Sequence, residues 1–152
     1  MKQKSFEIIE YQKEYEPLLF SFLERCLPES HRCLDINGRH SYYLNIAKHF
    51  VGFWCLFDGN NMIGTVAVSE LESQSCELKS LYLLEQYQGM GYGKKMLVYA
   101  IGQAKNHGYK KMFLDSLSTS IKAIALYRKV GFHDTEKYNS SVYSDVFMVL
   151  DL

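Results

Sequence analysis

The glycine-rich segment Gln88-Gly89-Met90-Gly91-Tyr92-Gly93-Lys94 is where residue type and spacing most clearly indicate chemistry. It follows an apolar stretch typical of a strand and precedes a helical pattern, so it predicts a strand-to-helix turn. Such a turn presents backbone N–H groups at the positive end of a helix, and glycines let a phosphate approach without obstruction by Cβ atoms. The segment therefore predicts an anion cradle, with a merely tight turn as the alternative.

Two common phosphate-binding patterns do not fit this segment. A Walker A loop needs Ser or Thr after Gly93-Lys94, where Lys95 stands, and a glycine where Gln88 stands. A dinucleotide-binding fingerprint needs a glycine at the position of Lys94, and it should follow the first strand of the fold rather than lie past mid-chain. The segment therefore indicates neither an ATP-type loop nor an NAD-type fold.

A third pattern, Gln/Arg-x-x-Gly-x-Gly/Ala, is matched by Gln88, Gly91 and Gly93. A second segment, Ala123-Ile124-Ala125-Leu126-Tyr127-Arg128-Lys129-Val130-Gly131-Phe132, matches the pattern Ala-x-x-Leu-Tyr-x-x-x-Gly-Phe. In both segments the chain resembles the GNAT family of acyl-CoA-dependent N-acetyltransferases, and the order of predicted elements agrees with that family from Phe6 to Leu150.

The resemblance implies an α/β fold in which a mixed, mostly antiparallel, twisted sheet is flanked by helices. The sheet would splay into a central V between strands at Cys76–Leu84 and Lys111–Leu114, with acetyl-CoA seated in the gap. The backbone of Leu81 to Leu83 would hold the pantetheine arm in the manner of an added strand, and the glycine turn would wrap the pyrophosphate. The cofactor-binding residues implied in this way are Leu81, Tyr82, Leu83, Gln88, Gly89, Met90, Gly91, Tyr92, Gly93, Lys94, Ser120 and Ala123.

Ser120 departs from the family pattern, because members often carry Asn seven residues before the tyrosine of the second segment. The serine hydroxyl either replaces that hydrogen bond or serves only as a helix cap. The pyrophosphate cradle does not depend on this position.

Two residues are candidates for proton transfer. Tyr127 matches the family tyrosine that protonates the departing thiolate, a role open to a phenol with a pKa of about 10, and its alternative is a half-buried core tyrosine. An acceptor amine must lose a proton before it attacks, and Glu77 lies eleven residues before Gln88, the spacing of the catalytic glutamate in histone-type members of the family. Glu77 is therefore the predicted base, acting directly or through water, and its alternative is a strand glutamate paired with a neighbouring lysine.

The elements that must position these residues follow from hydrophobic periodicity and from turn signals. The strand at Cys76–Leu84 is predicted to place Glu77, Leu81 and Leu83 on one face. The other expected elements are a strand at Phe6–Tyr11, a helix at Lys13–Leu27 ended by Pro28, a short helix at Tyr42–Phe50, a hairpin of Val51–Phe57 with Met62–Ser69, a helix from the glycine turn to Gly108, a strand at Lys111–Leu114, a helix capped by the hydroxyls of Ser118–Ser120 and stopped by Gly131, and a strand at Val146–Leu150.

Composition limits the class of protein. With 152 residues, 47% apolar and 22% charged, the chain is expected to form one domain over residues 1–152. Seventeen basic residues balance seventeen acidic ones, so no overall charge attracts nucleic acid or an anionic membrane. Four cysteines are too few for a disulfide scaffold, and five histidines show no metal-ligand spacing, so we expect no metal. The sequence shows no signal peptide and no membrane-spanning run, which predicts a cytoplasmic protein.

The function expected from this resemblance is direct transfer of an acetyl group from acetyl-CoA to a primary amine, on a small molecule or a protein, within a ternary complex. Backbone N–H groups near Leu83 would polarise the thioester carbonyl. The acceptor would contact Pro28–Phe50 and His133–Tyr143, whose His40, Tyr42, Tyr43, Tyr138 and Tyr143 either line a pocket or simply pack. The alternatives are a non-catalytic CoA-binding or sensing module, dimeric through an edge strand at Val146–Leu150, and an interaction domain without cofactor.

Overall fold

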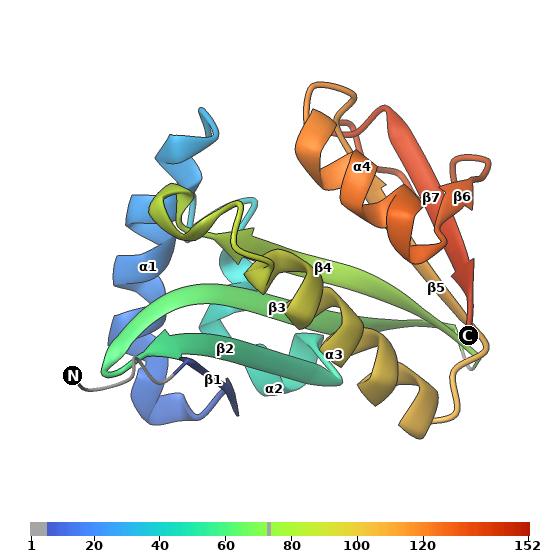
Figure 1. Ribbon diagram of the computed structural model, residues 1–152. Helices are drawn as coiled ribbons and strands as arrows, with labels where there is room; N and C mark the ends of the chain where they lie inside the picture. The colour runs from blue at the N-terminus through green and yellow to red at the C-terminus, as the bar shows by residue number, and fades with distance from the viewer. Residues whose placement is uncertain (1–5, 73) are drawn as a thin grey trace.

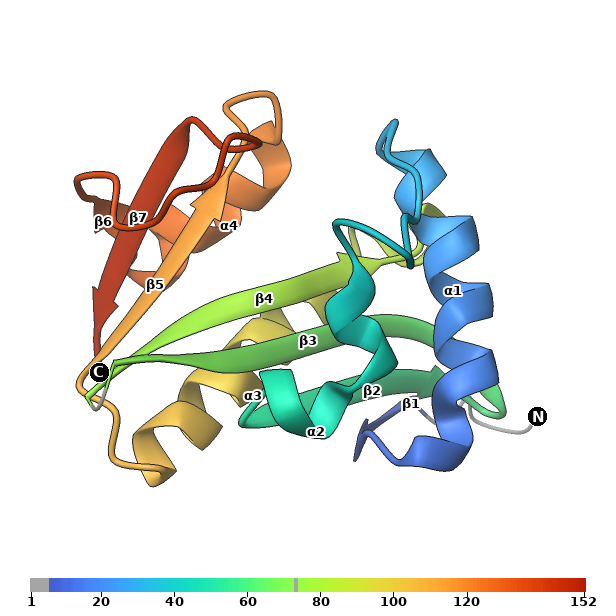
Figure 2. The same cartoon turned by 180° about the vertical axis from the view of Figure 1, so that it is seen from behind.

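The computed structural model describes residues 6–72 and 74–152, which form one seven-stranded sheet with helices on both faces (Figures 1 and 2). The strands follow the order β1-β2-β3-β4-β5-β7-β6 across the sheet. Their bounds are β1 Phe6–Glu10, β2 Gly52–Asp58, β3 Asn61–Glu72, β4 Ser75–Leu83, β5 Lys111–Ser116, β6 His133–Asp134 and β7 Val146–Asp151. The helices are η1 Lys13–Tyr15, α1 Glu16–Glu29, η2 Ser41–Leu44, α2 Ile46–His49, η3 Glu85–Tyr87, α3 Tyr92–Asn106 and α4 Ile121–Val130.

The sheet splays between β4 and β5, the only parallel pair among its neighbouring strands in the described residues. These two strands pair only where Ser75, Cys76 and Glu77 face Lys111, Met112 and Phe113. Beyond that apex they diverge, and the sheet forms the V that Figure 1 shows between β4 and β5. The prediction of a mixed, mostly antiparallel sheet with a central splay is therefore confirmed.

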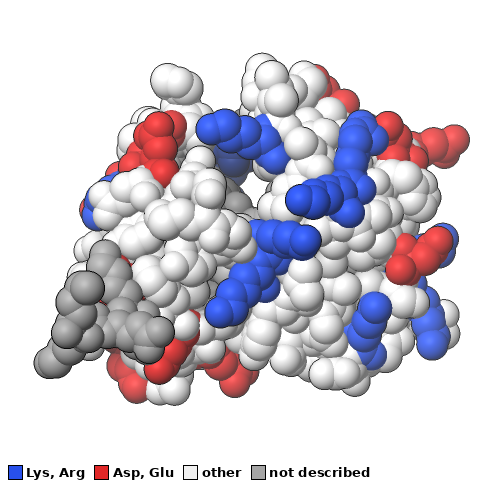
Figure 3. All heavy atoms as spheres, viewed as in Figure 1, with Lys and Arg blue, Asp and Glu red and all other residues white. Residues whose placement is uncertain are grey.

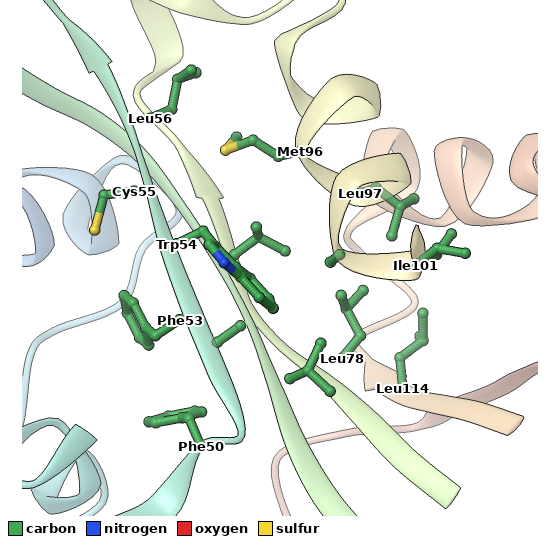
Figure 4. Close-up of a cluster of buried hydrophobic side chains, with 14 of the residues drawn as sticks. Phe50, Phe53, Trp54, Cys55, Leu56, Leu78, Met96, Leu97, Ile101 and Leu114 are labelled. Atoms are coloured by element: carbon green, nitrogen blue, oxygen red, sulfur yellow. The ribbon is translucent and has the colours of Figure 1, made fainter. Parts of the chain in front are cut away.

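The core lies on both faces of β2 and β3. The run Phe53 to Phe57 is buried throughout, because α1 and α2 cover one face of the sheet and α3 covers the other (Figures 1 and 2). Successive side chains alternate between the two layers. Phe53 packs edge to face against Phe50, whereas Trp54 lies toward α3 and meets Tyr99 (Figure 4).

The helix ends agree with the sequence signals in two places and differ in two. Gly108 and Gly131 take the left-handed conformation predicted for helix caps, with φ of +87° and +119°. Helix α1 runs through Pro28, because a proline in the last turn removes only one intrahelical hydrogen bond. The helix predicted at Tyr42–Phe50 is instead divided into η2 and α2 at Asn45, whose side chain accepts a hydrogen bond from the Lys48 N–H.

The alternation predicted for β4 is wrong beyond Lys79, because the strand contains a bulge. Lys79 lies opposite Ala67 and Tyr82 lies opposite Thr65, so β4 has one more residue than β3 between these pairs. Ser80 adopts a φ of +53° in the bulge. Tyr82 therefore shares the face of Glu77, and Leu83 lies on the other face.

The strand β7 is not the edge predicted for Val146–Leu150. It pairs with β5 on one side, and the unpredicted strand β6 pairs with its other side at Val149 and Met148. Because β6 covers the centre of β7, less of the edge of β7 is free to pair with a strand of a second chain.

Candidate active site

A cleft of about 490 Å³ lies where β4 and β5 diverge. One wall is the stretch of β4 from Leu78 to Leu83, and the other is the end of β5 together with α4. Seven of the residues predicted for the site line this cleft: Leu81, Tyr82, Leu83, Gln88, Ser120, Ala123 and Tyr127.

The wall formed by β4 exposes a strand edge to the cleft. Because β5 leaves β4 after Glu77, the backbone from Leu78 onward has no strand partner on this side within the described part of the chain. An extended ligand arm can pair with such an edge by main-chain hydrogen bonds. At its far end, the Gln88 side-chain amide donates to the Leu83 carbonyl at 3.0 Å and ties the glycine turn to the strand.

The remaining residues of the glycine turn, Gly89 to Lys94, do not line the cleft but form the turn and the first turn of α3 beyond Gln88. Gly89 and Gly91 have φ of +81° and +89°, and no atom lies within 4 Å of the Cβ position of either residue. The first N–H groups of an α-helix lack intrahelical partners, and no side chain caps α3. The turn thus presents donors beside open space, as an anion site requires.

Basic side chains lie near the turn, along the opening of the cleft. Figure 3 shows Lys and Arg side chains gathered along the opening between the two halves of the molecule. Lys94 is exposed on the first turn of α3, whereas the ring of Tyr92 packs on Phe6 with 4.5 Å between centroids. Of these two predicted residues, Tyr92 therefore contributes only its backbone to the turn.

Alanine substitutions at Gly91 and Gly93 should distinguish the effect of a strained backbone conformation from the effect of an added Cβ atom. Gly91→Ala is expected to destabilise the fold by about 1–2 kcal/mol, because a Cβ is strained at positive φ. It should also weaken acetyl-CoA binding about 10-fold, since relaxation of the strain disturbs the turn. Gly93→Ala is the matched control, because its Cβ would lie an ordinary 3.7 Å from Leu126. Chemical denaturation and calorimetric titration measure both effects, and equal losses in the two variants would contradict this account.

Tyr127 projects from α4 into the cleft while most of its surface is buried, at 8% exposure. Its ring meets Phe132 edge to face at 5.9 Å, so the residue also packs in the core. Burial, reinforced by the nearby Tyr82, raises the pKa of Tyr127 to about 12. The phenol is therefore a proton donor, not a phenolate, at neutral pH.

Glu77 lies at the apex of the splay and does not line the cleft that the described residues form. The residue is 7% exposed, and its carboxylate lies 3.1 Å from the Lys79 ammonium, so the pairing with a lysine that was considered as its alternative role is present. The Tyr138 hydroxyl donates to the same carboxylate. Burial is the larger cause of the raised pKa of that tyrosine, and the negative charge of Glu77 is the second. The Asn139 amide donates a further hydrogen bond at 3.2 Å.

Asp115 is a cleft carboxylate that the sequence reasoning missed. It lies at the carboxyl end of β5, where the Ser144 hydroxyl and the Asn139 amide each donate to it at 2.6 Å. Asn139 thus bridges Asp115 and Glu77. The available signal was an acidic residue ending an apolar strand, since ligands of open sheets bind beyond the carboxyl ends of strands. Nothing local in the sequence indicated Asn139.

The hydroxyl cap predicted for α4 is wrong. Ser120 occupies the N-cap position but its side chain makes no capping hydrogen bond. Ser118 binds the Asp145 carboxylate through its N–H and its hydroxyl, both at 2.7 Å. These bonds hold the loop before α4 against the segment before β7, and Ser120 is left facing the cleft.

Of the five residues predicted to meet the acceptor, two line the cleft, two are buried, and Tyr138 lies outside the lining and binds Glu77. Tyr42 and Tyr143 line the cleft. His40 and Tyr43 are buried, and the hydroxyls of Tyr43 and Ser80 share a hydrogen bond of 2.6 Å beneath the bulge.

The described residues contain neither a metal-binding cluster nor a membrane-spanning helix. Among residues 6–72 and 74–152, no three His, Cys, Asp or Glu side chains are grouped so as to hold a metal ion. In the same part of the chain, no helix combines the length and the apolar character needed to cross a bilayer.

A sheet that splays at a parallel pair, with a glycine turn leading into a helix at the mouth of the splay, defines the class of acyl-CoA N-acyltransferase folds. The model of the Acetyltransferase (GNAT) family matches residues 10–132, and the chain belongs to this family. The recognition made from Gln88, Gly91, Gly93 and the Tyr127 segment is thereby confirmed.

Individual relatives agree with this placement. The chain is 32% identical over 83 residues to the uncharacterized N-acetyltransferase YjgM of Escherichia coli K12, covering 53% of this chain and 50% of that protein. The chain thus spans about half the length of this curated relative. An acetyltransferase structure from Streptococcus agalactiae superposes with a TM-score of 0.88 at 17% identity, covering 97% of this chain and 98% of that one. A GNAT structure from Elizabethkingia anophelis with acetyl-CoA bound gives 0.74 at 18% identity, covering 99% and 100%.

Proposed function

We propose that the protein transfers an acetyl group from acetyl-CoA to a primary amine, with both substrates in the cleft at the same time. The observation that carries this proposal is the convergence of three features on one cavity. These are the unpaired edge of β4, the glycine turn joined to it by Gln88, and the phenol of Tyr127. The acetyl-CoA-bound structure from Elizabethkingia anophelis supports the choice of cosubstrate.

The residues present fit acetyl-CoA. The backbone of Leu81 to Leu83 would hold the pantetheine arm, and the N–H groups from Gly89 to Lys94 would bind the pyrophosphate beside the open space over Gly89 and Gly91. Ser120 and Ala123 line the opposite wall. When bound, acetyl-CoA supplies an activated acetyl group and a thiolate leaving group.

Proton transfer in this proposal uses groups on both walls. The Tyr127 hydroxyl gives its proton to the leaving sulfur, and its raised pKa means that the phenol carries this proton at neutral pH. A carboxylate accepts the proton of the incoming amine. Asp115 takes this role here because it lines the cleft, and Glu77, the base predicted from sequence, is the second candidate, acting directly or through water.

The test is calorimetric titration of the protein with acetyl-CoA, with NAD and ATP as controls, followed by thiol-release assays over a panel of amines. We expect saturable binding of one acetyl-CoA, no binding of the controls, and turnover with at least one amine. Binding without turnover would favour the CoA-binding or sensing module. A folded protein that does not bind acetyl-CoA would refute the transferase proposal.

A further inference from the structure

The side of the cleft away from the glycine turn is bordered by two segments that approach from opposite halves of the molecule. Figure 2 shows the segment between α1 and η2 on one side of the gap and the segment between β6 and β7 on the other. Arg39 of the first segment and Tyr143 of the second meet across it, with the guanidinium carbon 3.7 Å from the ring centroid. Both residues line the cleft.

Two guanidinium groups line the cleft: Arg39 on this side, and Arg32 between His40 and the end of α1 at Cys26. Arg32 and Arg39 line the cleft, and neither forms an ion pair within the part of the chain that the structure describes. The stacking of Arg39 on Tyr143 leaves the N–H donors at the edge of its guanidinium free for a planar anion. The third cation of the lining, Lys79, is already paired with Glu77.

The acidic groups of the lining lie at two places, the end of β4 and the β5 wall. Glu29 accepts a hydrogen bond from the Glu85 N–H, so these two residues lie together at the end of β4 next to the glycine turn. Asp115 is on the β5 wall. A simple cationic amine would therefore meet Asp115 favourably but would be repelled by Arg32 and Arg39. An acceptor that carries a carboxylate as well as an amine can bind the guanidinium groups with its carboxylate and Asp115 with its amine.

The size of the cleft sets a further limit. About 490 Å³ must hold the acetyl end of the cosubstrate as well as the part of the acceptor that carries its amine and carboxylate, so these two groups lie close together in the acceptor. Tyr42, Tyr82 and Tyr143 give the cavity aromatic surface that suits an apolar or aromatic side chain.

We infer that the acceptor is a small amino carboxylate, such as an α-amino acid, whose carboxylate binds Arg39 and Arg32 while its amine lies toward Asp115. This inference rests on the proposed acetyl transfer and names the substrate class for the same cleft. A bidentate pair between guanidinium and carboxylate would fix the orientation of the amine.

The experiment compares phenylalanine, phenylalaninamide and 2-phenylethylamine as acceptors, in the parent protein and in Arg39→Gln and Arg32→Gln. Lys111→Gln is the control, since it removes one positive charge at the Lys111–Asp151 pair outside the cleft. We expect the acid to be preferred about 10-fold or more in kcat/KM over the amide, and Arg39→Gln to lower kcat/KM for the acid about 10- to 100-fold with little change for the amide. The amine of the amide has the lower pKa, so a larger fraction of it is unprotonated at neutral pH, and easier deprotonation cannot explain a preference for the acid.

Equal use of acid and amide by the parent, or equal losses for both in Arg39→Gln, would overturn the inference while leaving acetyl transfer intact. If no amine is acetylated, the proposed function fails, and calorimetric titration of the CoA-saturated protein with phenylalanine decides the inference separately. Binding that Arg39→Gln abolishes and Lys111→Gln retains would support the carboxylate site, and absence of binding to the parent would refute it.

Discussion

Replacing Tyr127 with phenylalanine is expected to lower kcat by about 100-fold or more, because a positioned general acid contributes about 10²–10⁴ to the rate. The affinity for acetyl-CoA should stay within about two-fold, since the phenyl ring retains the packing on Phe132 and only the hydroxyl is lost. Thiol release under saturating substrates measures kcat, and calorimetry measures affinity. A variant that turns over at the parental rate would eliminate Tyr127 as the acid.

The control is Tyr109→Phe, which removes a tyrosine hydroxyl that donates to Glu70 and does not line the cleft. Its kcat should match that of the parent. The pH profile gives a second check, because Tyr127 must be protonated to act. With its pKa raised to about 12, loss of that proton begins only at high pH, so Tyr127 should cause no fall in kcat between pH 8 and pH 10.

Asp115→Asn is expected to reduce kcat/KM at pH 7 by about 100-fold or more, because the acceptor amine would then lack a base in the cleft. The deficit should shrink as pH rises toward the pKa of the amine, since the amine then loses its proton to solvent. Glu77→Gln is the matched comparison, and we expect a loss of about 10-fold or less, because Glu77 lies behind the lining, where it holds Asn139 and Lys79 in place.

The two carboxylate variants decide between the base assignments. A larger loss in Glu77→Gln, with its pH dependence altered, would restore the assignment made from sequence and refute Asp115. Because Asn139 donates to both carboxylates, thermal denaturation of each variant should accompany the kinetics to show that the bridged loop is retained.

The parts of the site that sequence reasoning could predict are those encoded within one continuous segment. The glycine turn and the Tyr127 segment each combine a motif with the helix that carries it, and the structure brings Gln88 and Tyr127 to the same cleft. The splay was predictable only through the family resemblance. Hydrophobic alternation gave the strands but not the bulge at Ser80, because a period of two contains no signal for an inserted residue.

Other parts depend on contacts between distant segments. Asn139 meets Asp115 across 24 positions of sequence and Glu77 across 62, and these bonds exist because the β6–β7 segment folds back over the apex. The guanidinium of Arg39 is likewise positioned by a distant residue, because it stacks on the ring of Tyr143. Neither arginine nor asparagine stands in a recognisable motif, so their roles follow from tertiary structure alone.

The short apex of the V also has a mechanical consequence. The six residues of β4 beyond Glu77 form a lever arm of about 20 Å, since each strand residue advances about 3.3 Å. Rotation of one half by about 5° at the apex would therefore displace the mouth of the cleft by about 1.7 Å, roughly a third of the spacing between neighbouring strands. Cys76 and Met112 are register partners at the apex and both are fully buried, so such a rotation would be centred on them. Side-chain volume at these two positions, far from any reacting atom, would thus set the aperture through which both substrates enter.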